Sequence, residues 1–311
     1  MNSVLLHLLS YTGLVVALAA MARRVQVYLS TPLHLRWELY PVAHEGGKRA
    51  GYGGSYLEEV DWWTKPRHTN IFNEIKAMAL EILFLRGVWE HNRSLWYRSF
   101  PFHFGLYLVL AWLALLVIGA FLQMFGFDPA GDGALATLLR VKTTFCGVFG
   151  FLLTMIGSAG LFFRRYLDED LRNYSSSADF FNLALIFVTM LTAFCSYIFE
   201  DHGFFQARAY VHSLLTFDFA ELGGVLFGVQ VLLGAVLMAY IPLTHMAHFF
   251  TKYFFYHDIR WNDTPNVRGE TYDQQISEVL GYKLNWNAPH IKAEGKKTWA
   301  QVATEETKDN D

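Results

Sequence analysis

Two histidines stand at the ends of apolar segments, where a polar ring needs a partner. His103 lies at the start of an uncharged stretch that runs to Phe125, and His248 closes the sequence PLTHMAH at the end of another. A polar side chain in or near hydrocarbon is costly unless it is paired. Two imidazoles at matched depth on two helices can bind one iron from opposite faces of a porphyrin. The alternative is that each ring bonds a backbone carbonyl or lies in the headgroup layer.

Three further histidines are candidates for a role at such a site. His245 precedes His248 by three residues, so the two lie within one helical turn and partly share a face. His245 is therefore an alternative ligand, a quinone hydrogen-bond donor or a structural group. His7 and His212, near the opposite ends of their segments, are candidates for a second haem. Surface solvation is the default for the rest: His34, His44, His68, His91, His202, His257 and His290.

The composition indicates the elements that must hold these rings. The chain has 311 residues, of which 53% are hydrophobic and 17% are charged, more apolar than an ordinary soluble domain. Five windows each offer roughly the 20 residues that cross a ~30 Å hydrocarbon core as a helix. We predict an all-α integral membrane protein, a bundle of five transmembrane helices near residues 4–22, 102–125, 143–163, 179–199 and 221–250. Arg23 and Arg24 follow the first window without a cleavage site, which indicates a retained helix rather than a signal peptide.

Basic residues near the ends of the spans predict the orientation, because they resist translocation. One side is flanked by Arg23, Arg24, Arg86, Arg93, Arg98, Arg164, Arg165, Arg172, Lys252 and Arg260. The other side has only Arg140, Lys142 and Arg208. This bias predicts a multi-pass protein of the cytoplasmic (inner) membrane with its N-terminus outside and its C-terminus in the cytoplasm. It also places the start of the second span and the end of the fifth at the same, cytoplasmic, face.

The predicted layout has four parts. Residues 1–25 form the first transmembrane helix, and residues 26–100 form an amphipathic, aromatic-rich cytoplasmic connection. Residues 101–250 contain helices 2–5 with the haem site, and residues 251–311 form a polar cytoplasmic tail that we expect to be extended. Within the connection, the spacing of Ile75, Ala79 and Ile82 predicts a helix over Asn73–Leu85.

Several functional classes are disfavoured. Cys146 and Cys195 fall inside predicted helices, so neither a disulfide framework nor a cysteine-ligated cluster is expected. No C-x-x-C-H motif occurs, which excludes covalent c-type haem by the usual motif. We expect no nucleic-acid partner. Acidic residues are absent from the middle of the windows, which argues against a transporter subunit with an ion relay. A membrane anchor or transporter subunit without a redox cofactor is the alternative function.

Other polar groups are assigned by their placement. Arg98 and Arg164 are candidates to bind haem propionates, since guanidinium binds carboxylates bidentately; the alternative is that they are ordinary membrane-end anchors. One haem near one face leaves most of a ~30 Å core uncrossed. Either a quinone occupies the outer half or a second haem b is present. The polar groups available there for a quinone are Gln230, Glu200, Asp201, His202, His212 and Glu221.

The layout resembles the cytochrome b (gamma) subunit of respiratory nitrate reductase and its relatives. That resemblance implies five helices, an outside N-terminus and histidine ligands on helices 2 and 5. His103, in Phe-His-Phe-Gly, matches the cytoplasmic-side ligand of helix 2. His248 follows Pro242 by six residues, as the family's helix 5 ligand does, and is therefore preferred to His245. Leu113 and Gln230 stand where two-haem members have their second ligand pair, so the outer haem is in doubt.

A second resemblance rests on three sequences in the first connection. These are LRWELYPVAHE at 35–45, YLEEVDWW at 56–63 and WEHNRSLWYR at 89–98. They are similar to the membrane cytochrome b of complexes that sulfate reducers and related anaerobes pair with a tetrahaem cytochrome c. This resemblance implies anaerobic respiration, a cytoplasmic iron-sulfur partner of the heterodisulfide-reductase type, a periplasmic multihaem cytochrome c, and menaquinone as an exchange partner. The function expected is a haem b electron-transfer subunit of a membrane oxidoreductase complex.

Overall fold

The computed structural model describes residues 2–30, 60, 65, 70–219, 221, 223–250, 266–285 and 293–305. Within these residues the fold is helical, with one isolated β-bridge and no strand. The chain divides into two compact units, residues 1–20 with 75–246 and residues 21–74 with 247–311. The motif at 35–45, all but one residue of the motif at 56–63, and the basic residues Lys252 and Arg260 lie outside the described residues.

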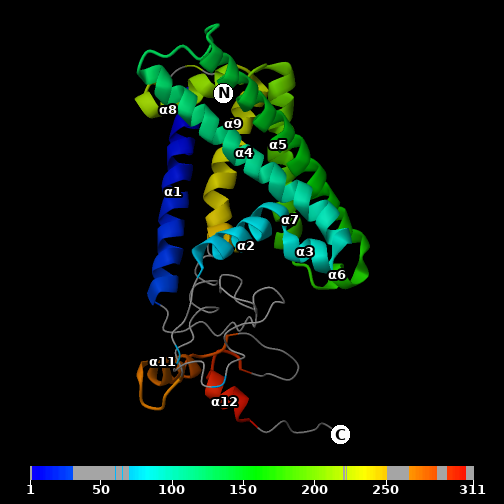
Figure 1. Cartoon of the computed structure of the whole chain (residues 1–311), viewed down its shortest axis with the longest axis vertical. Coiled ribbons are helices and arrows are strands. Elements are labelled where there is room, and N and C mark those ends of the chain that lie inside the picture. Colours follow the sequence, from blue (N-terminus) through cyan, green and yellow to red (C-terminus); the bar gives the residue numbers. More distant parts are fainter. Residues whose placement is uncertain are drawn as a thin grey trace. The chain divides into compact units, whose positions relative to one another are not determined.

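The first unit is a bundle of long helices joined by short ones (Figure 1). The long helices are α1 (Ser3–Ser30), α4 (Arg93–Met124), α5 (Ala134–Leu167), α7 (Ser177–Phe199) and α9 (Val225–Tyr240). The short ones are α2 (Ile71–Phe84), α3 (Arg86–His91), α6 (Glu169–Asn173) and α8 (Phe205–Thr216). Two 3-10 turns follow α9, η4 (Ile241–Leu243) and η5 (His245–Ala247). Helices α1 and α2 each cross the boundary between the units.

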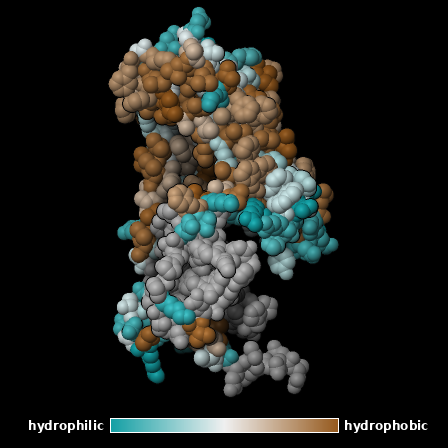
Figure 2. Space-filling view, viewed as in Figure 1, coloured by the Kyte–Doolittle hydropathy of each residue, from teal (hydrophilic) through white to brown (hydrophobic). Residues whose placement is uncertain are grey.

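The prediction of five spanning helices is confirmed. Five helices are long and apolar enough to cross a membrane by length and composition: Ser3–Ser30, Arg93–Met124, Ala134–Leu167, Ser177–Phe199 and Val225–Leu243. Figure 2 shows hydrophobic side chains over the middle of the bundle and hydrophilic ones gathered toward its ends. The last helix is shorter than its predicted window, because Pro242 has no amide hydrogen to donate and the α-helix ends at Tyr240. The chain is therefore an all-helical, multi-pass membrane protein that lies in a lipid bilayer.

Helices α4 and α5 pack antiparallel at positions that only glycine can occupy. A side chain at Gly157 would meet the backbone of Phe102. A Cβ atom at Gly150 would lie 2.9 Å from the amide nitrogen of Val109. Small residues at helix interfaces allow this approach, and van der Waals packing drives helix association where lipid removes the hydrophobic force. We call this contact the glycine seam; it fixes which face of α4 turns away from α5.

Phe204 closes the other end of the glycine seam. Its φ of 58° lies in the left-handed region, which is unfavourable for a bulky residue. Its ring is buried, with centroids 5.2 Å from Trp112 and 6.0 Å from Phe151. A Cβ atom at Gly147 would lie 2.5 Å from the Phe204 ring. The core packing of this ring offsets the strained backbone and holds the start of α8 against α4 and α5.

Two consecutive carboxylates cap the two helices that follow α7. Glu200 accepts hydrogen bonds from the amides of the first turn of α9, the closest being Phe227 at 2.7 Å. Asp201 accepts from Gln206 and Ala207 in the first turn of α8, at 2.8 and 2.9 Å. The first amides of a helix have no partner within it, and a carboxylate there also complements the helix dipole. Glu200 and Asp201 therefore have a structural role that the sequence did not indicate.

Polar side chains attach α1 to α8. His7 Nε2 lies 2.7 Å from Ser213 Oγ, Ser10 Oγ lies 2.7 Å from Tyr210 Oη, and the Tyr11 hydroxyl donates to the Leu214 carbonyl at 2.8 Å. These α1 residues are spaced by three and one, so they share one face of the helix. The first helix is therefore joined to the bundle by hydrogen bonds near its N-terminal end.

The end of α2 is joined to α4 by two side-chain hydrogen bonds. The Tyr107 hydroxyl donates to the Ile82 carbonyl at 2.7 Å, and Trp96 Nε1 donates to the Phe84 carbonyl at 2.7 Å. These carbonyls belong to the last turn of α2, whose oxygens have no partner within the helix. The helix predicted over Asn73–Leu85 is confirmed, and its last turn is fixed against α4.

The described part of the second unit includes a small folded segment in the tail. Helix α11 (Thr271–Leu280) is followed by a β-bridge between Lys283 and Thr298, and α12 (Trp299–Ala303) comes next. Val279, Leu284 and Ala293 are buried there. The expectation of an extended tail did not include this segment.

Replacing Gly157 by alanine tests the glycine seam. The added methyl group would force α4 and α5 apart, and overpacking of this kind costs about 1–3 kcal/mol of unfolding free energy. Gly133→Ala is the matched control, because no atom lies within 4 Å of its Cβ position and its φ is −64°. Thermal unfolding in detergent should show a loss for Gly157→Ala alone; equal stability of both variants would contradict the seam.

Tyr107→Phe tests the attachment of α2. Loss of one hydrogen bond costs about 1 kcal/mol, which corresponds to about fivefold faster hydrogen exchange in the last turn of α2 if that turn opens locally. Tyr97→Phe is the control, because its ring is exposed and its hydroxyl makes no hydrogen bond within the described residues. Unchanged exchange in Tyr107→Phe would show that the hydroxyl does not hold α2.

Candidate haem site

His103 lies one turn above Ser99 on α4, in a half-buried position. Its Nδ1 is 2.8 Å from the Ser99 carbonyl oxygen and 3.2 Å from Ser99 Oγ. A carbonyl oxygen can only accept, so Nδ1 donates this bond, and in the neutral ring Nε2 then carries the lone pair. Histidines that bind metals usually donate their other ring nitrogen in this way, which orients the ring and raises its basicity. A bond to a backbone carbonyl is what the alternative without haem predicts, and it is also the bond that would orient Nε2 of His103 as a ligand atom.

The face of α4 that carries His103 is turned away from the glycine seam. At 3.6 residues per turn, His103 shares a stripe with Tyr107, Leu110, Ala114 and Val117. Leu110, Ala114 and Val117 are exposed, whereas Phe102 and Val109, which face the seam, are half-buried. Tyr107 belongs to the stripe and bonds the last turn of α2. The ring thus stands on an apolar surface of a kind that would pack against a porphyrin.

The surroundings of α9 differ from those of α4. Helix α4 packs on α5 and α8, and α9 packs on α7, while α4 and α9 share no extensive contact within the described residues. No atom lies within 4 Å of the Cβ position of Gly234, in the middle of α9. The face drawn in Figure 2 is also hollowed beside α1. An oriented imidazole beside an apolar stripe is chemically suited to a haem b, so His103 and its stripe on α4 would be one side of such a site.

The two candidate ligands after α9 lie in different surroundings. His245 is exposed, and its Nε2 lies 3.5 Å from Asp179 Oδ1 at the start of α7. Asp179 also closes the capping box of α7 with Ser176. His248 is exposed and falls in the second unit, which is described separately from the unit that holds His103.

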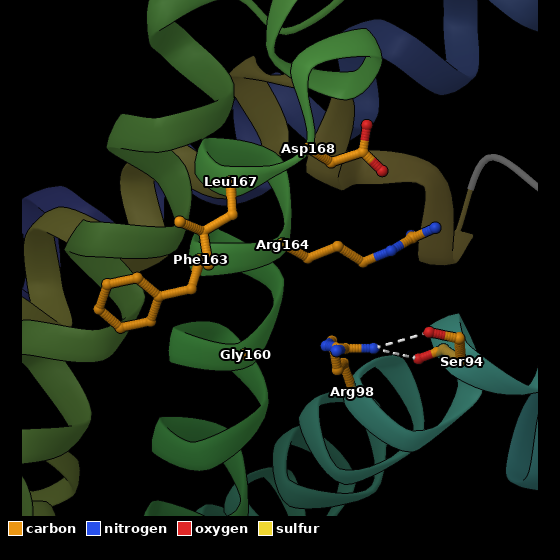
Figure 3. A pocket seen from close by; sticks show the side chains of 7 residues that line it. All are labelled: Ser94, Arg98, Gly160, Phe163, Arg164, Leu167 and Asp168. Atoms are coloured by element: carbon orange, nitrogen blue, oxygen red, sulfur yellow. Dashed lines mark hydrogen bonds between the residues drawn. The ribbon is translucent and has the colours of Figure 1, made fainter.

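Arg98 and Arg164 are brought together, but on another side of α4. Both line one pocket, with Arg98 Nη1 donating to the Ser94 carbonyl at 2.6 Å (Figure 3). Arg98 precedes His103 by five residues, which places the two about 140° apart around the helix. Arg98 thus faces the end of α5, where Gly160 lies beside its side chain. This placement gives the propionate prediction no support.

The residues predicted near the outer face are spread over several elements. His7 is fully buried, and its Nδ1 and Nε2 lie 2.8 Å from the Ser3 carbonyl and 2.7 Å from Ser213 Oγ. Its geometry suits a structural role in joining α1 to α8. His212 and Gln230 are half-buried on α8 and α9, and His202 is exposed before α8. Leu113, on α4, is 43% exposed and so faces away from the packed interior of the bundle.

Sequence reasoning counted Arg208 only as a basic residue at a membrane end. The structure places it inside the bundle, 2% exposed, with Nε near Gly119 of α4. Its Nε and Nη2 have no hydrogen-bond partner within the described residues. Burial lowers the pKa of Arg208 from its ordinary value, and the charge of Asp201 opposes that shift. The one sequence feature that could have indicated this burial is Gly119, because a glycine in a helix leaves space for a long side chain from a neighbouring helix.

Among the described residues, no three His, Cys, Asp or Glu side chains gather to hold a metal ion. A haem needs only axial ligands from the chain, since the porphyrin supplies the other four nitrogens.

A comparison with known protein families identifies the family of the chain. Residues 88–262, more than half of the chain, match the family described as nitrate reductase gamma subunit. No curated protein and no solved structure matches the chain. The matched range contains α4, α5, α7 and α9, and with them His103, His245 and His248. The family is one of haem b-binding membrane subunits that transfer electrons within redox complexes. The chain therefore belongs to the nitrate reductase gamma subunit family and is a membrane electron-transfer cytochrome b subunit.

Proposed function

We propose that this chain binds haem b through His103 and His248 and passes electrons across the cytoplasmic membrane in an anaerobic respiratory complex. The observation that carries the proposal is the hydrogen bond from His103 Nδ1 to the Ser99 carbonyl, at 2.8 Å. This bond would orient Nε2 toward an iron, on the stripe of α4 that faces away from the glycine seam.

The second axial ligand is His248 in this proposal. His245 Nε2 lies 3.5 Å from Asp179 Oδ1, so in this structure that nitrogen faces a carboxylate at the start of α7. His248 also keeps the six-residue spacing from Pro242 that the family resemblance implies. His245 remains the alternative ligand, and the variants described below separate the two.

When bound, a haem b with two imidazole ligands carries single electrons and has no open position for oxygen chemistry. The chain's own residues set the conditions for this role. Ser99 orients His103, and the exposed apolar side chains of Leu110 and Val117 on the same stripe offer a surface for a porphyrin. Tyr107 and Trp96 hold the last turn of α2 against α4.

The orientation and partners in this proposal come from the charge bias and from the sequence resemblance. The N-terminus is outside and the C-terminus is cytoplasmic. On the cytoplasmic side the partner is an iron-sulfur subunit of the heterodisulfide-reductase type. On the periplasmic side, electrons are exchanged with a multihaem cytochrome c, with menaquinone, or with both. The complex would serve sulfate reduction or a related anaerobic respiration.

The outer half of the membrane needs its own electron carrier. Gln230 and His202 are the groups proposed to bind a quinone there. A second haem held by His7 and His212 is the alternative, although both ring nitrogens of His7 lie at hydrogen-bond distance from α1 and α8 partners. Glu200 and Asp201 are not part of the proposed quinone site, because their carboxylates cap α9 and α8.

Reduced-minus-oxidised spectra with pyridine haemochrome quantitation test the proposal on the purified full chain. We expect one b-type haem per chain, lost in His103→Ala and in His248→Ala and retained in His245→Ala. His91→Ala is the matched control, because this exposed histidine ends α3 near the start of α4.

Each other outcome has a definite meaning. Haem retained in His103→Ala would contradict the assignment. Haem lost in His245→Ala and kept in His248→Ala would exchange the two ligands. A second haem that remains in both His103→Ala and His248→Ala would support the site at His7 and His212. A chain without haem would favour a membrane anchor or transporter subunit that lacks a redox cofactor.

A further inference from the structure

A pocket of about 490 Å³ lies between the start of α4 and the end of α5. Arg98 and Ser94 line it from α4, and Arg164, Phe163 and Leu167 line it from α5. Figure 3 shows the Arg164 side chain extended into the space above Arg98 and Ser94, with Asp168 on the far side. None of these residues belongs to the face of α4 that carries His103, so the pocket is distinct from the candidate haem site.

The positive charge in the pocket exceeds the negative charge. Arg98 Nη1 donates to the carbonyl and hydroxyl oxygens of Ser94, at 2.6 and 3.0 Å, and no carboxylate pairs with it in the described residues. Arg164 makes no ion pair there either. The single carboxylate, Asp168, caps α6 by accepting from the Leu171 amide at 3.2 Å. Two guanidinium groups that share one pocket are suited to bind a phosphate or carboxylate.

The α5 side of the pocket leads onto an apolar surface. Phe163 is 57% exposed and Leu167 is 75% exposed at the pocket itself. Ile156 and Phe149 are also exposed and precede Phe163 by seven and fourteen residues, so all three side chains lie on one face of α5. Fourteen residues of helix span about 21 Å, which is more than the ~15 Å of hydrocarbon in one leaflet. A ligand with an anionic head and a long apolar tail would match both parts.

We propose that this pocket binds the phosphate of an anionic phospholipid between Arg98 and Arg164, with an acyl chain along Phe163, Ile156 and Phe149. These three apolar side chains favour a lipid over a free phosphate ion, because a phosphate ion has no apolar part to bury against them. Gly160 contributes space, because a Cβ atom there would lie 3.3 Å from Arg98 Cγ. The proposal does not rest on haem binding and can be tested on haem-free protein.

Native mass spectrometry of the full chain tests this site. The delipidated protein is titrated with dioleoyl phosphatidylglycerol and, separately, with dioleoyl phosphatidylcholine. The wild type should bind the anionic lipid more tightly. Arg164→Gln should weaken that binding about tenfold, and Arg98→Gln/Arg164→Gln should abolish the preference. The Arg164 side chain makes no hydrogen bond within the described residues, so the single variant is expected to fold.

Arg172→Gln is the matched control, because Arg172 lies near the same end of the bundle on α6 and outside the pocket. It should bind phosphatidylglycerol as the wild type does. Equal binding by the Arg164→Gln and wild-type proteins would overturn the proposal. Complete displacement of the lipid by millimolar inorganic phosphate would also overturn it, in favour of a free-anion site. Loss of haem with unchanged lipid binding would assign the arginines to haem propionates instead.

Discussion

The close approach of α4 and α5 at the glycine seam is the constraint on which the rest of the bundle depends. Gly150 and Gly157 bring the two backbones into contact, and Gly147 admits the ring of Phe204. Any larger side chain at these positions would separate the helices, since buried interfaces resist added volume. The seam decides which side chains of α4 face protein. It thereby leaves His103 on the opposite stripe and places Arg98 beside Gly160.

The position of His103 in the first third of α4 is accounted for by its hydrogen bond to the preceding turn. A ring at the edge of hydrocarbon needs partners for its nitrogens. Ser99 supplies an acceptor for Nδ1 from within the same helix, at 2.8 Å, and this orients Nε2, with its lone pair, as the ligand atom. The same logic applies at the other end of the bundle, where Glu200 and Asp201 satisfy the first amides of α9 and α8.

Much of the fold could be predicted from sequence because lipid requires long apolar helices. Three of the five predicted windows fall within the helices observed, and the window at 102–125 passes the end of α4 by one residue. Pro242 explains why the last helix ends before its window does. The helix over Asn73–Leu85 could also be predicted, from its apolar spacing. These features depend on local composition and periodicity alone.

The parts that could not be predicted depend on contacts between distant residues. From the sequence, Glu200 is only a polar group near the outer face. Its capping role depends on the amide of Phe227, twenty-seven residues later, which donates a hydrogen bond to it. From the sequence, Arg208 is only a basic residue at a membrane end, and its burial against Gly119 depends on how α8 packs on α4. Tyr107 acquires a role only through its bond to Ile82. Arg98 could be predicted to bind an anion, but the helix face on which it lies follows from the glycine seam.

The most direct test of the central claim is ligand rescue at the His103 position. The electron paramagnetic resonance spectrum of oxidised His103→Gly protein should lack the low-spin signal of a haem with two imidazole ligands. Added imidazole should restore that signal by occupying the space of the missing side chain. A low-spin signal that persists in His103→Gly without imidazole would contradict the account, because the iron would then have another ligand.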